Sequence, residues 1–373
     1  MCGFCLFLPV TDLQQIMIPS IRLQSQQLVH PAFDLPRELV SWMGAVQAQD
    51  YRMAKWALHL RLRSASAGAV DEALRSGEIV RTHIMRPTWH FVAGEDIRWM
   101  LMLSGKRVRL ANESFGRRFG ISEAQYCRCN DLIGDMLRGG KSMTCREIGS
   151  SLEEAGIPDA SQLVRRFLLR AESDGIICSG PDRDRQPTFA LFDERVPRGK
   201  ELSRDEALAT LATRYFRSHT PATLQDFVWW SGLSLSEARR AMGSIHADLE
   251  TGRFGGSELL VHRYWCGSRD PHTGGRAAGE VLHLLPPYDE YLISYKERGE
   301  VLSERYRSKA FNRWGIFYPV ILHNGHIVGN WKPATGKRKG ICETSFFDPK
   351  YYFDPVLLDH AVKRYGEFTG KRG

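Results

Sequence analysis

The sequence lacks a hydrophobic run long enough to cross a bilayer, which takes about 20 consecutive apolar residues. The one apolar stretch at an end, "MCGFCLFLPV", is short, has no basic residue ahead of it and runs into polar sequence. It therefore fits neither a membrane span nor a secretory leader. We expect a cytoplasmic protein whose partner is not a membrane.

A complete set of metal ligands is also lacking. The eight cysteines include a pair at Cys2 and Cys5 and another at Cys127 and Cys129. No second CxxC or HxxxH follows either pair at the spacing of a four-ligand zinc site. Scattered cysteines are typical of reduced thiols inside the cell. We therefore expect no bound metal, and nothing in the sequence calls for a cofactor.

Acidic residues are in the minority, 43 against 51 Lys and Arg, for a formal net charge of +8. The excess is concentrated between Arg81 and Arg118, where eight cations meet three acids, a difference of +5. A smaller cluster is Lys337, Arg338 and Lys339. Such runs can be solvated faces, but together they favour a polyanionic partner, most commonly nucleic acid. The candidate DNA-binding residues are Arg81, Lys106, Arg107, Arg109, Arg117, Arg118, Arg165, Arg166, Arg239 and Arg240.

The predicted fold class is α+β, with three tandem winged-helix modules before a mostly β C-terminal domain. The middle module, 126–200, is the most regular: three helices precede two short strands around the polar tip "PDRDRQ". The last of these helices carries Leu163, Val164, Phe167 and Leu168 on one face and Arg165, Arg166 and Arg170 on the other. We expect an extension at 1–16 and modules at 17–125, 126–200 and 201–275.

A weak internal repeat supports tandem modules. Thr144 and Glu147 have the spacing of a capping box, and Thr223 and Asp226 repeat it in the next module. The last region, 276–373, differs: two β-rich runs flank Asn324-Gly325, the favoured pair for a type I′ turn. We expect a mostly β domain there, a small barrel being one form it can take, with a closing helix near "PVLLDHAVKRYGEF".

Five segments in order, "GAVQAQD", "RTHIMRPTWHFVAGEDIRWML", "PATLQDFVWWSGL", "LLPPYDEYLISYKER" and "HNGHIVGNWKP", resemble the AlkZ-like DNA glycosylases. The resemblance runs from about residue 20 to the C-terminus. It implies tandem winged helices with a β-rich C-terminal domain. It also implies excision of N7-alkylated purines, including bulky adducts and interstrand crosslinks. The family's catalytic motif, Gln-x-Gln, matches Gln47 and Gln49 here; a sister branch has Asp in the last position.

Paired amides suit this chemistry. Cleavage of the glycosidic bond passes through an oxocarbenium-like sugar, and an N7-alkylpurine is already cationic, so it leaves without a general acid. What remains is to position a water and to stabilise the developing charge. Gln47 and Gln49 could do both, or could simply be polar residues at a helix end. We expect both side chains to be partly exposed in a groove between the first module and the rest of the chain.

Other residues near the motif have two interpretations each. Asp50 is expected to cap the following helix, with an auxiliary catalytic role as the alternative. Arg86, Thr88 and His90 alternate on a predicted strand, so they share a face that is turned outward if Trp89 and Phe91 fill the core. This face is either simply solvated or directed towards DNA, and a similar run in the family implies an auxiliary role for the three residues. Asp289 and Glu290 lie beside the Pro-Pro break, where a structural role at a hairpin corner is expected.

Two hypotheses of function remain. The first is a monofunctional DNA glycosylase acting on double-stranded DNA as a monomer. The second is a winged-helix regulator without catalysis, which the basic segment and the modules fit equally well. The Gln pair separates them, because a regulator has no need of it. Regulators are also commonly dimers on symmetric sites, whereas three modules in one chain can wrap a duplex alone.

Overall fold

The computed structural model describes residues 12–64, 66, 68–199, 201–254, 257–266, 279–334 and 340–370. The Cys2 and Cys5 pair and the cluster at 337–339 lie outside the described residues. Helix α1 (Asp12–Ser25) begins before residue 17, so the boundary expected there falls inside a helix.

The first region contains a three-stranded antiparallel sheet in the order β1-β3-β2, with β3 in the middle. The helices predicted around the Gln motif and the hairpin that follows are both confirmed. After α1, the elements are α2 (Pro36–Met43), β1 (Val46–Gln47), α3 (Tyr51–His59), α4 (Ala69–Ser76), β2 (Ile79–Ile84), β3 (Thr88–Ala93), η1 (Gly94–Asp96), α5 (Ile97–Gly116) and η2 (Arg117–Phe119).

The second region has the predicted three helices and two strands, plus one short strand that was not predicted. Its capping box is confirmed: the Thr144 side chain accepts from the Glu147 amide, and the Glu147 carboxylate accepts from the Thr144 amide. The strands pair antiparallel in the order β4-β6-β5. The elements are α6 (Glu123–Leu137), β4 (Ser142–Thr144), α7 (Cys145–Glu154), α8 (Ala160–Ser173), β5 (Ile177–Ser179), β6 (Thr188–Leu191) and α9 (Phe192–Arg195).

The third region repeats the pattern with a two-stranded sheet. Thr223 and Asp226 form the second predicted capping box. The elements are α10 (Arg204–Ser218), α11 (Leu224–Ser231), α12 (Leu235–Ser244), η3 (His246–Asp248), β7 (Leu249–Phe254), β8 (Ser257–His262) and α13 (Arg263–Cys266).

The C-terminal region is built on a four-stranded antiparallel sheet in the order β12-β11-β10-β9. Asn324 and Gly325 have φ of 47° and 84°, as the predicted type I′ turn requires. The sheet is open, with β12 and β9 at its edges, so no closed barrel is found in this described part of the chain. The elements are β9 (Leu282–Leu285), α14 (Glu290–Ile293), η4 (Glu304–Tyr306), α15 (Arg307–Ala310), β10 (Val320–His323), β11 (His326–Pro333), β12 (Cys342–Phe346) and α16 (Pro355–Thr369).

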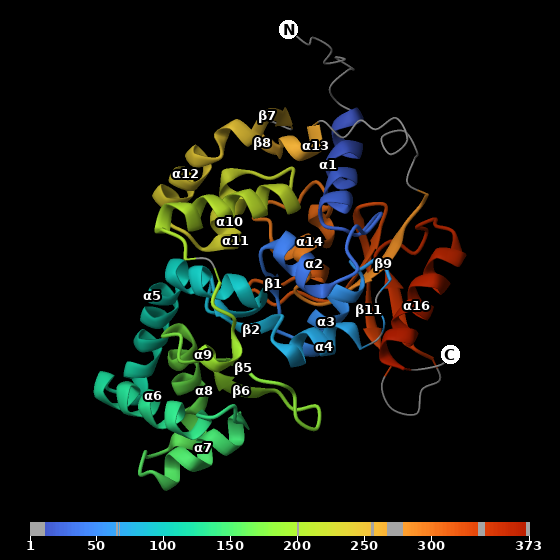
Figure 1. Cartoon of the computed structure of the whole chain (residues 1–373). Coiled ribbons are helices and arrows are strands. Elements are labelled where there is room, and N and C mark those ends of the chain that lie inside the picture. Colours follow the sequence, from blue (N-terminus) through green and yellow to red (C-terminus); the bar gives the residue numbers. More distant parts are fainter. Residues whose placement is uncertain are drawn as a thin grey trace.

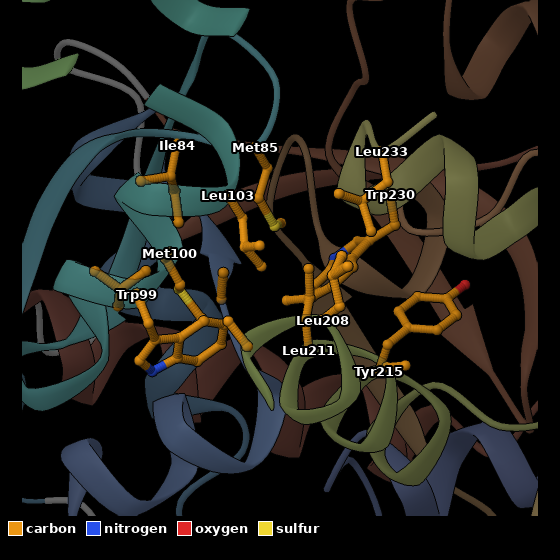
Figure 2. Packing of buried hydrophobic residues seen from close by; sticks show 14 of the residues in the cluster. Ile84, Met85, Trp99, Met100, Leu103, Leu208, Leu211, Tyr215, Trp230 and Leu233 are labelled. Atoms are coloured by element: carbon orange, nitrogen blue, oxygen red, sulfur yellow. The ribbon is translucent and has the colours of Figure 1, made fainter. Parts of the chain in front are cut away.

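The regions share their cores. Trp99, Met100 and Leu103 of α5 pack with Leu208 and Leu211 of α10 in one cluster, which Figure 2 shows from close by. Another cluster joins residues of α1 and α3 to the C-terminal sheet, which lies beside α16 in Figure 1. The second region has a cluster almost entirely its own. The first region is therefore held between the third and the C-terminal regions.

Two questions raised by the sequence concern metals and membranes. The cysteines that the structure describes are free, and Cys127 is exposed while Cys129 is buried, so the two thiols do not point to a common ligand. Within the described ranges no three potential metal-ligating side chains cluster. Across the same ranges, no helix combines the length and the apolar character needed to traverse a bilayer.

The packing of α5 against α8 generates a stability prediction. A Cβ atom on Gly105 would lie 2.7 Å from the Ser173 carbonyl oxygen, whereas one on Gly134 of α6 would meet nothing nearer than 4.0 Å. Gly105→Ala should lower the free energy of unfolding by about 1–3 kcal/mol through overpacking. The matched Gly134→Ala should raise it by about 0.5–1 kcal/mol, because alanine is the better helix former. Thermal melts of the two variants that coincide would contradict this account of the interface.

Candidate functional site

The Gln motif forms one edge of the first sheet. Gln47 pairs with His90 across β1 and β3, and the Ala48 amide donates to the Trp89 carbonyl at 2.7 Å. Val46 and Ala48 are buried in the hydrophobic core, so strand alternation puts the two glutamine side chains on the opposite face. Asp50 accepts from the Met53 amide at 3.1 Å and caps α3. The expected capping role of Asp50 is confirmed.

The two amides differ in exposure. Gln49 is exposed, but Gln47 is only 5% exposed, so the expectation that both line an open groove is wrong for Gln47. Gln47 is buried because residues from distant segments of the chain lie over it. Arg86 donates to the Gln47 Oε1 at 3.1 Å, and the Glu290 carboxylate lies against its backbone amide.

Glu290 is the buried charge at the centre of the site. Its Oε1 accepts from the Gln47 backbone amide at 2.5 Å, and its Oε2 accepts from the Trp230 indole at 3.1 Å and from the Ser294 hydroxyl. Burial opposes the charge, but His219 in its protonated form, together with the Ser294 and Gln47 donors, outweighs it and lowers the pKa of Glu290 to about 2. A fully buried carboxylate therefore stays ionised beneath the motif.

Two histidines next to this carboxylate stay neutral. His219 Nε2 lies 3.6 Å from the Glu290 carboxylate, too far for a direct hydrogen bond, and burial lowers its pKa. Burial, followed by the charge of Arg86, lowers the pKa of His90 to about 4. Neither side chain carries a proton that it could release near neutral pH.

The burial of His90 contradicts the prediction of an outward polar face. It is 1% exposed and pairs across the sheet with the buried Thr82. Both faces of β3 are covered from His90 to Ala93, so alternation there selects between two buried environments rather than between core and solvent. Phe91 fills the core as predicted, whereas Trp89 is half-buried.

Arg86 and Thr88 flank the covered motif. The Arg86 guanidinium lies 5.4 Å from the centre of the Trp229 ring, and Trp229 is 40% exposed. The Trp229 indole is fixed by a hydrogen bond to the Ile293 carbonyl at 2.8 Å. Among the described residues, no partner is found for the buried Arg86 Nε or Thr88 Oγ1. Buried polar groups usually have partners, so these two atoms are hydrogen-bonding capacity beside Gln47 that the described protein groups do not use.

Two of the candidate DNA-binding arginines support the site from within. Arg81 donates to the Ala48 carbonyl at 3.0 and 2.8 Å and lies 4.1 Å from the Trp89 ring. Arg107 donates to the Met85 carbonyl at 3.1 Å, in the turn before Arg86. Both guanidinium groups therefore hold backbone that carries motif residues.

The other candidate cations lie on helices, where some pair with acidic side chains, one stacks on an aromatic ring and others are exposed. Arg109 pairs with Glu113 at 3.3 Å, Arg166 stacks 3.9 Å from the Phe115 ring, and Arg240 pairs with Asp205. Arg170, expected on the solvent face of α8, is instead buried and pairs with Glu113, Glu123 and Asp174. The exposed candidates are Lys106, Arg117, Arg118, Arg165 and Arg239, together with Arg240, which is exposed although it pairs with Asp205.

Sequence reasoning missed Glu290, Trp230 and Ser294. It assigned Glu290 to a hairpin corner with Asp289, and for Asp289 a structural role holds, since it caps α14 and pairs with buried Arg61 at 2.7 Å. A signal was present, because both "WW" and "DEY" lie inside segments that carry the family resemblance. Four of those five segments meet around Gln47.

The chain is similar to known proteins in family, sequence and fold. A family model described as DNA glycosylase AlkZ-like matches residues 40–368. A protein from Streptomyces sahachiroi named interstrand DNA cross-link repair glycosylase is 24% identical over 328 residues, which is 83% of this chain and 85% of that protein. The solved structure of the Streptomyces sahachiroi DNA glycosylase AlkZ matches with a TM-score of 0.77 at 21% identity, covering 97% of this chain and 98% of that one.

The unequal burial of the amides generates a second prediction. Gln47→Ala removes the acceptor of an Arg86 N–H in a covered site and should cost about 1–2 kcal/mol of unfolding free energy. Gln49→Ala removes only exposed atoms and should change it by no more than about 0.5 kcal/mol. Denaturant unfolding of the two single variants beside the parent chain measures both values. Equal losses would mean that the contact with Arg86 contributes nothing to stability.

Proposed function

The chain belongs to the AlkZ-like family of DNA glycosylases, and from this premise we propose that it hydrolyses the N-glycosidic bond of N7-alkylated purines in double-stranded DNA. Gln47 and Gln49 position the water that attacks the sugar. The observation that carries the proposal is the fixed position of Gln47, whose side-chain amide oxygen accepts from Arg86 and whose backbone amide donates to ionised Glu290, followed by the exposed side chain of Gln49.

The two amides have different tasks in the proposed reaction. The Gln47 side chain is held by Arg86, so its orientation in the site is fixed. The exposed Gln49 oxygen is free to accept a hydrogen bond from the attacking water. The water oxygen bonds to C1′, the C1′–N bond breaks with its electron pair going to the base, and the water proton is released to solvent.

Glu290 supplies negative charge that the motif itself lacks. The sugar becomes cationic as the bond breaks, and a fixed carboxylate nearby favours that charge more than it favours the neutral sugar. The carboxylate is behind the Gln47 backbone, so it acts through the field and by positioning the motif. It also offsets the charge of Arg86, which would otherwise oppose a cationic sugar.

The substrate range follows from the absence of an acid. Of the groups described around Gln47, Glu290 is ionised and His90 and His219 are neutral, so none of the three can protonate a leaving purine at neutral pH. The base must therefore already carry a positive charge, as an N7-alkylpurine does. We include bulky N7 adducts and interstrand crosslinks, because the similar protein from Streptomyces sahachiroi is named a cross-link repair glycosylase.

We further propose that the three helical regions act as winged-helix modules that hold the duplex for a single protein molecule. Each has helices followed by an antiparallel hairpin. The exposed cations Lys106, Arg117, Arg118, Arg165 and Arg239 would contact phosphates, a sequence-independent interaction that weakens with salt. Arg109, Arg166 and Arg240 could exchange their present partners for phosphates when DNA binds.

An excision assay tests the role of Gln49. On duplex DNA with one N7-methylguanine, Gln49→Ala should lower the single-turnover rate by ~10²-fold or more, because one preorganised polar contact in the transition state is lost. Gln49→Asp should keep part of the activity, since its carboxylate still accepts a hydrogen bond from water. The control is Gln162→Ala, an exposed glutamine on α8, which should excise at the parent rate. A Gln49→Ala protein as fast as the control would remove Gln49 from the mechanism.

A pH profile tests the proposed lack of acid–base catalysis. The pKa of Glu290 is about 2 and that of His90 about 4, and burial lowers the pKa of His219 below its usual value, so none of the three groups changes its charge between about pH 7 and 9. The single-turnover rate on N7-methylguanine DNA should therefore be flat across this window, unlike the profile of an enzyme with a general acid or base. Glu290→Gln should lower the plateau by ~10²-fold and leave it flat. A one-proton slope within the window would instead require a titrating catalytic group.

A further inference from the structure

A short hairpin in the C-terminal region presents an uncovered tryptophan. Phe311 and Phe317 pair as an antiparallel bridge and their rings stack with centroids 5.0 Å apart. Between them, Trp314 is 76% exposed and Ile316 is 44% exposed. Gly315 separates the two with φ of +77°, a conformation that favours glycine. The exposed segment from Asn312 to Ile316 is called the hairpin tip below.

The hairpin tip is an ordered turn. The Asn312 Oδ1 accepts from the backbone amides of Trp314 at 2.9 Å and Ile316 at 3.1 Å. The Asn312 amide donates to the Ile316 carbonyl at 3.0 Å, and the Gly315 amide donates to the Asn312 carbonyl at 3.1 Å. The backbone is thus fixed while the indole stays in solvent. A large apolar side chain on a rigid turn is suited to insertion into a partner, because little conformational entropy is lost on contact.

The base of the hairpin connects to the Gln motif in two ways, by a chain of contacts and by the electrostatic effect of Asp50 on Tyr288. In the first, the Arg298 guanidinium lies 4.8 Å from the Phe311 ring and 5.6 Å from the Trp229 ring. The Trp229 ring in turn lies against the guanidinium of Arg86, which donates to Gln47. The hairpin tip therefore extends from the same packed cluster that covers the motif.

The second connection begins at Tyr288. Its ring lies 6.2 Å from that of Phe317, and its pKa is raised by burial and then by Asp50 and Tyr318. Asp50 directly follows Gln49 in the chain. The hairpin base is therefore linked by contacts to the covered end of the motif, and Asp50, which follows its exposed end, acts electrostatically on Tyr288.

The surroundings of the hairpin tip are strongly basic. Residues 304–318 include four Arg and Lys and one acid, Glu304, which pairs with Arg307 at 3.3 Å, for a formal charge of +3. Arg305, Arg307, Lys309 and Arg313 are all exposed. The Arg313 guanidinium lies 4.8 Å from the Trp314 ring itself. An indole surrounded by cations is complementary to a stack of bases between phosphates, and bases stack on aromatic rings with little regard to sequence.

We propose that the hairpin tip is a second DNA-contacting element, in which Trp314 enters the base stack of the duplex beside the nucleotide held at Gln47 and Gln49. Insertion of an apolar side chain between base steps unstacks and bends the duplex. That deformation opens the glycosidic bond to the motif, while Arg305, Arg307, Lys309 and Arg313 contact the phosphates on either side. The inference rests on the proposed function in taking duplex DNA as the substrate.

Binding and unstacking are measured on undamaged DNA, so that the test does not depend on excision. The probe is a duplex with one 2-aminopurine, a base whose fluorescence rises when it leaves the stack. The full-length parent protein should raise the fluorescence and bind by anisotropy. Trp314→Ala should abolish the rise and weaken binding by about tenfold, as expected for the loss of one stacked contact. The matched control is Tyr352→Ala, since Tyr352 is 90% exposed, and it should behave as the parent.

Two further variants separate stacking from charge. Trp314→Phe should restore most of the fluorescence rise, because a smaller aromatic ring still stacks. Compared with Trp314→Ala, Trp314→Lys should bind DNA more tightly through its charge, but it should not raise the 2-aminopurine fluorescence. All variants should have the melting temperature of the parent protein, since the indole is outside the core. A parent protein that causes no rise, or equal effects of Trp314→Ala and Tyr352→Ala, would overturn the proposal. So would a contribution of Trp314 confined to single-stranded DNA or to self-association.

The outcomes also separate this inference from the proposed function. If the parent protein unstacks the duplex but does not excise N7-methylguanine, the hairpin tip stands and the substrate assignment fails. If it excises N7-methylguanine at equal rates with and without Trp314, and Trp314→Ala leaves the fluorescence rise unchanged, the glycosylase assignment stands and the hairpin tip fails.

Discussion

The structure around the motif depends on one buried carboxylate. Glu290 is held ionised by the Gln47 amide, the Trp230 indole and the Ser294 hydroxyl, with His219 close by. A buried charge is tolerated only when hydrogen bonds replace its water, and removal of a partner is costly. This requirement ties three segments to one point: the edge strand β1, the end of α11 and the start of α14. The position of Gln47 is thereby fixed with respect to the third and the C-terminal regions.

The shared cores make that convergence rigid. One hydrophobic cluster joins α5 to α10 and α11, and another joins α1 and α3 to the C-terminal sheet. The motif is therefore held between two parts of the chain that cannot shift without disturbing a close-packed interior. Gln49, which lies two residues after Gln47 and beyond the end of β1, keeps its side chain in solvent. A catalytic pair with one fixed and one accessible amide is the combination that positioning a water requires.

Local patterns predicted local structure well. The two capping boxes and the Asn324-Gly325 turn lie where the sequence indicated them, because each rests on contacts between residues a few positions apart. The helices and the first hairpin followed from periodicity for the same reason. The barrel did not follow, since closing a sheet depends on how its edge strands meet. The prediction for His90 failed because alternation identifies a face but cannot tell what covers it.

The sequence by itself determined the family, the Gln pair and the basic balance of the chain. It could not distinguish Gln47 from Gln49, which are chemically identical and two residues apart. The tertiary structure decided that one is covered and the other free, and it brought Glu290 to the motif across 243 positions of sequence. In the folded chain, Arg81 and Arg107 donate hydrogen bonds to backbone carbonyls instead of facing solvent. The physical reason is that burial and buried charge arise from contacts between distant segments, and no local spacing records which segments will meet.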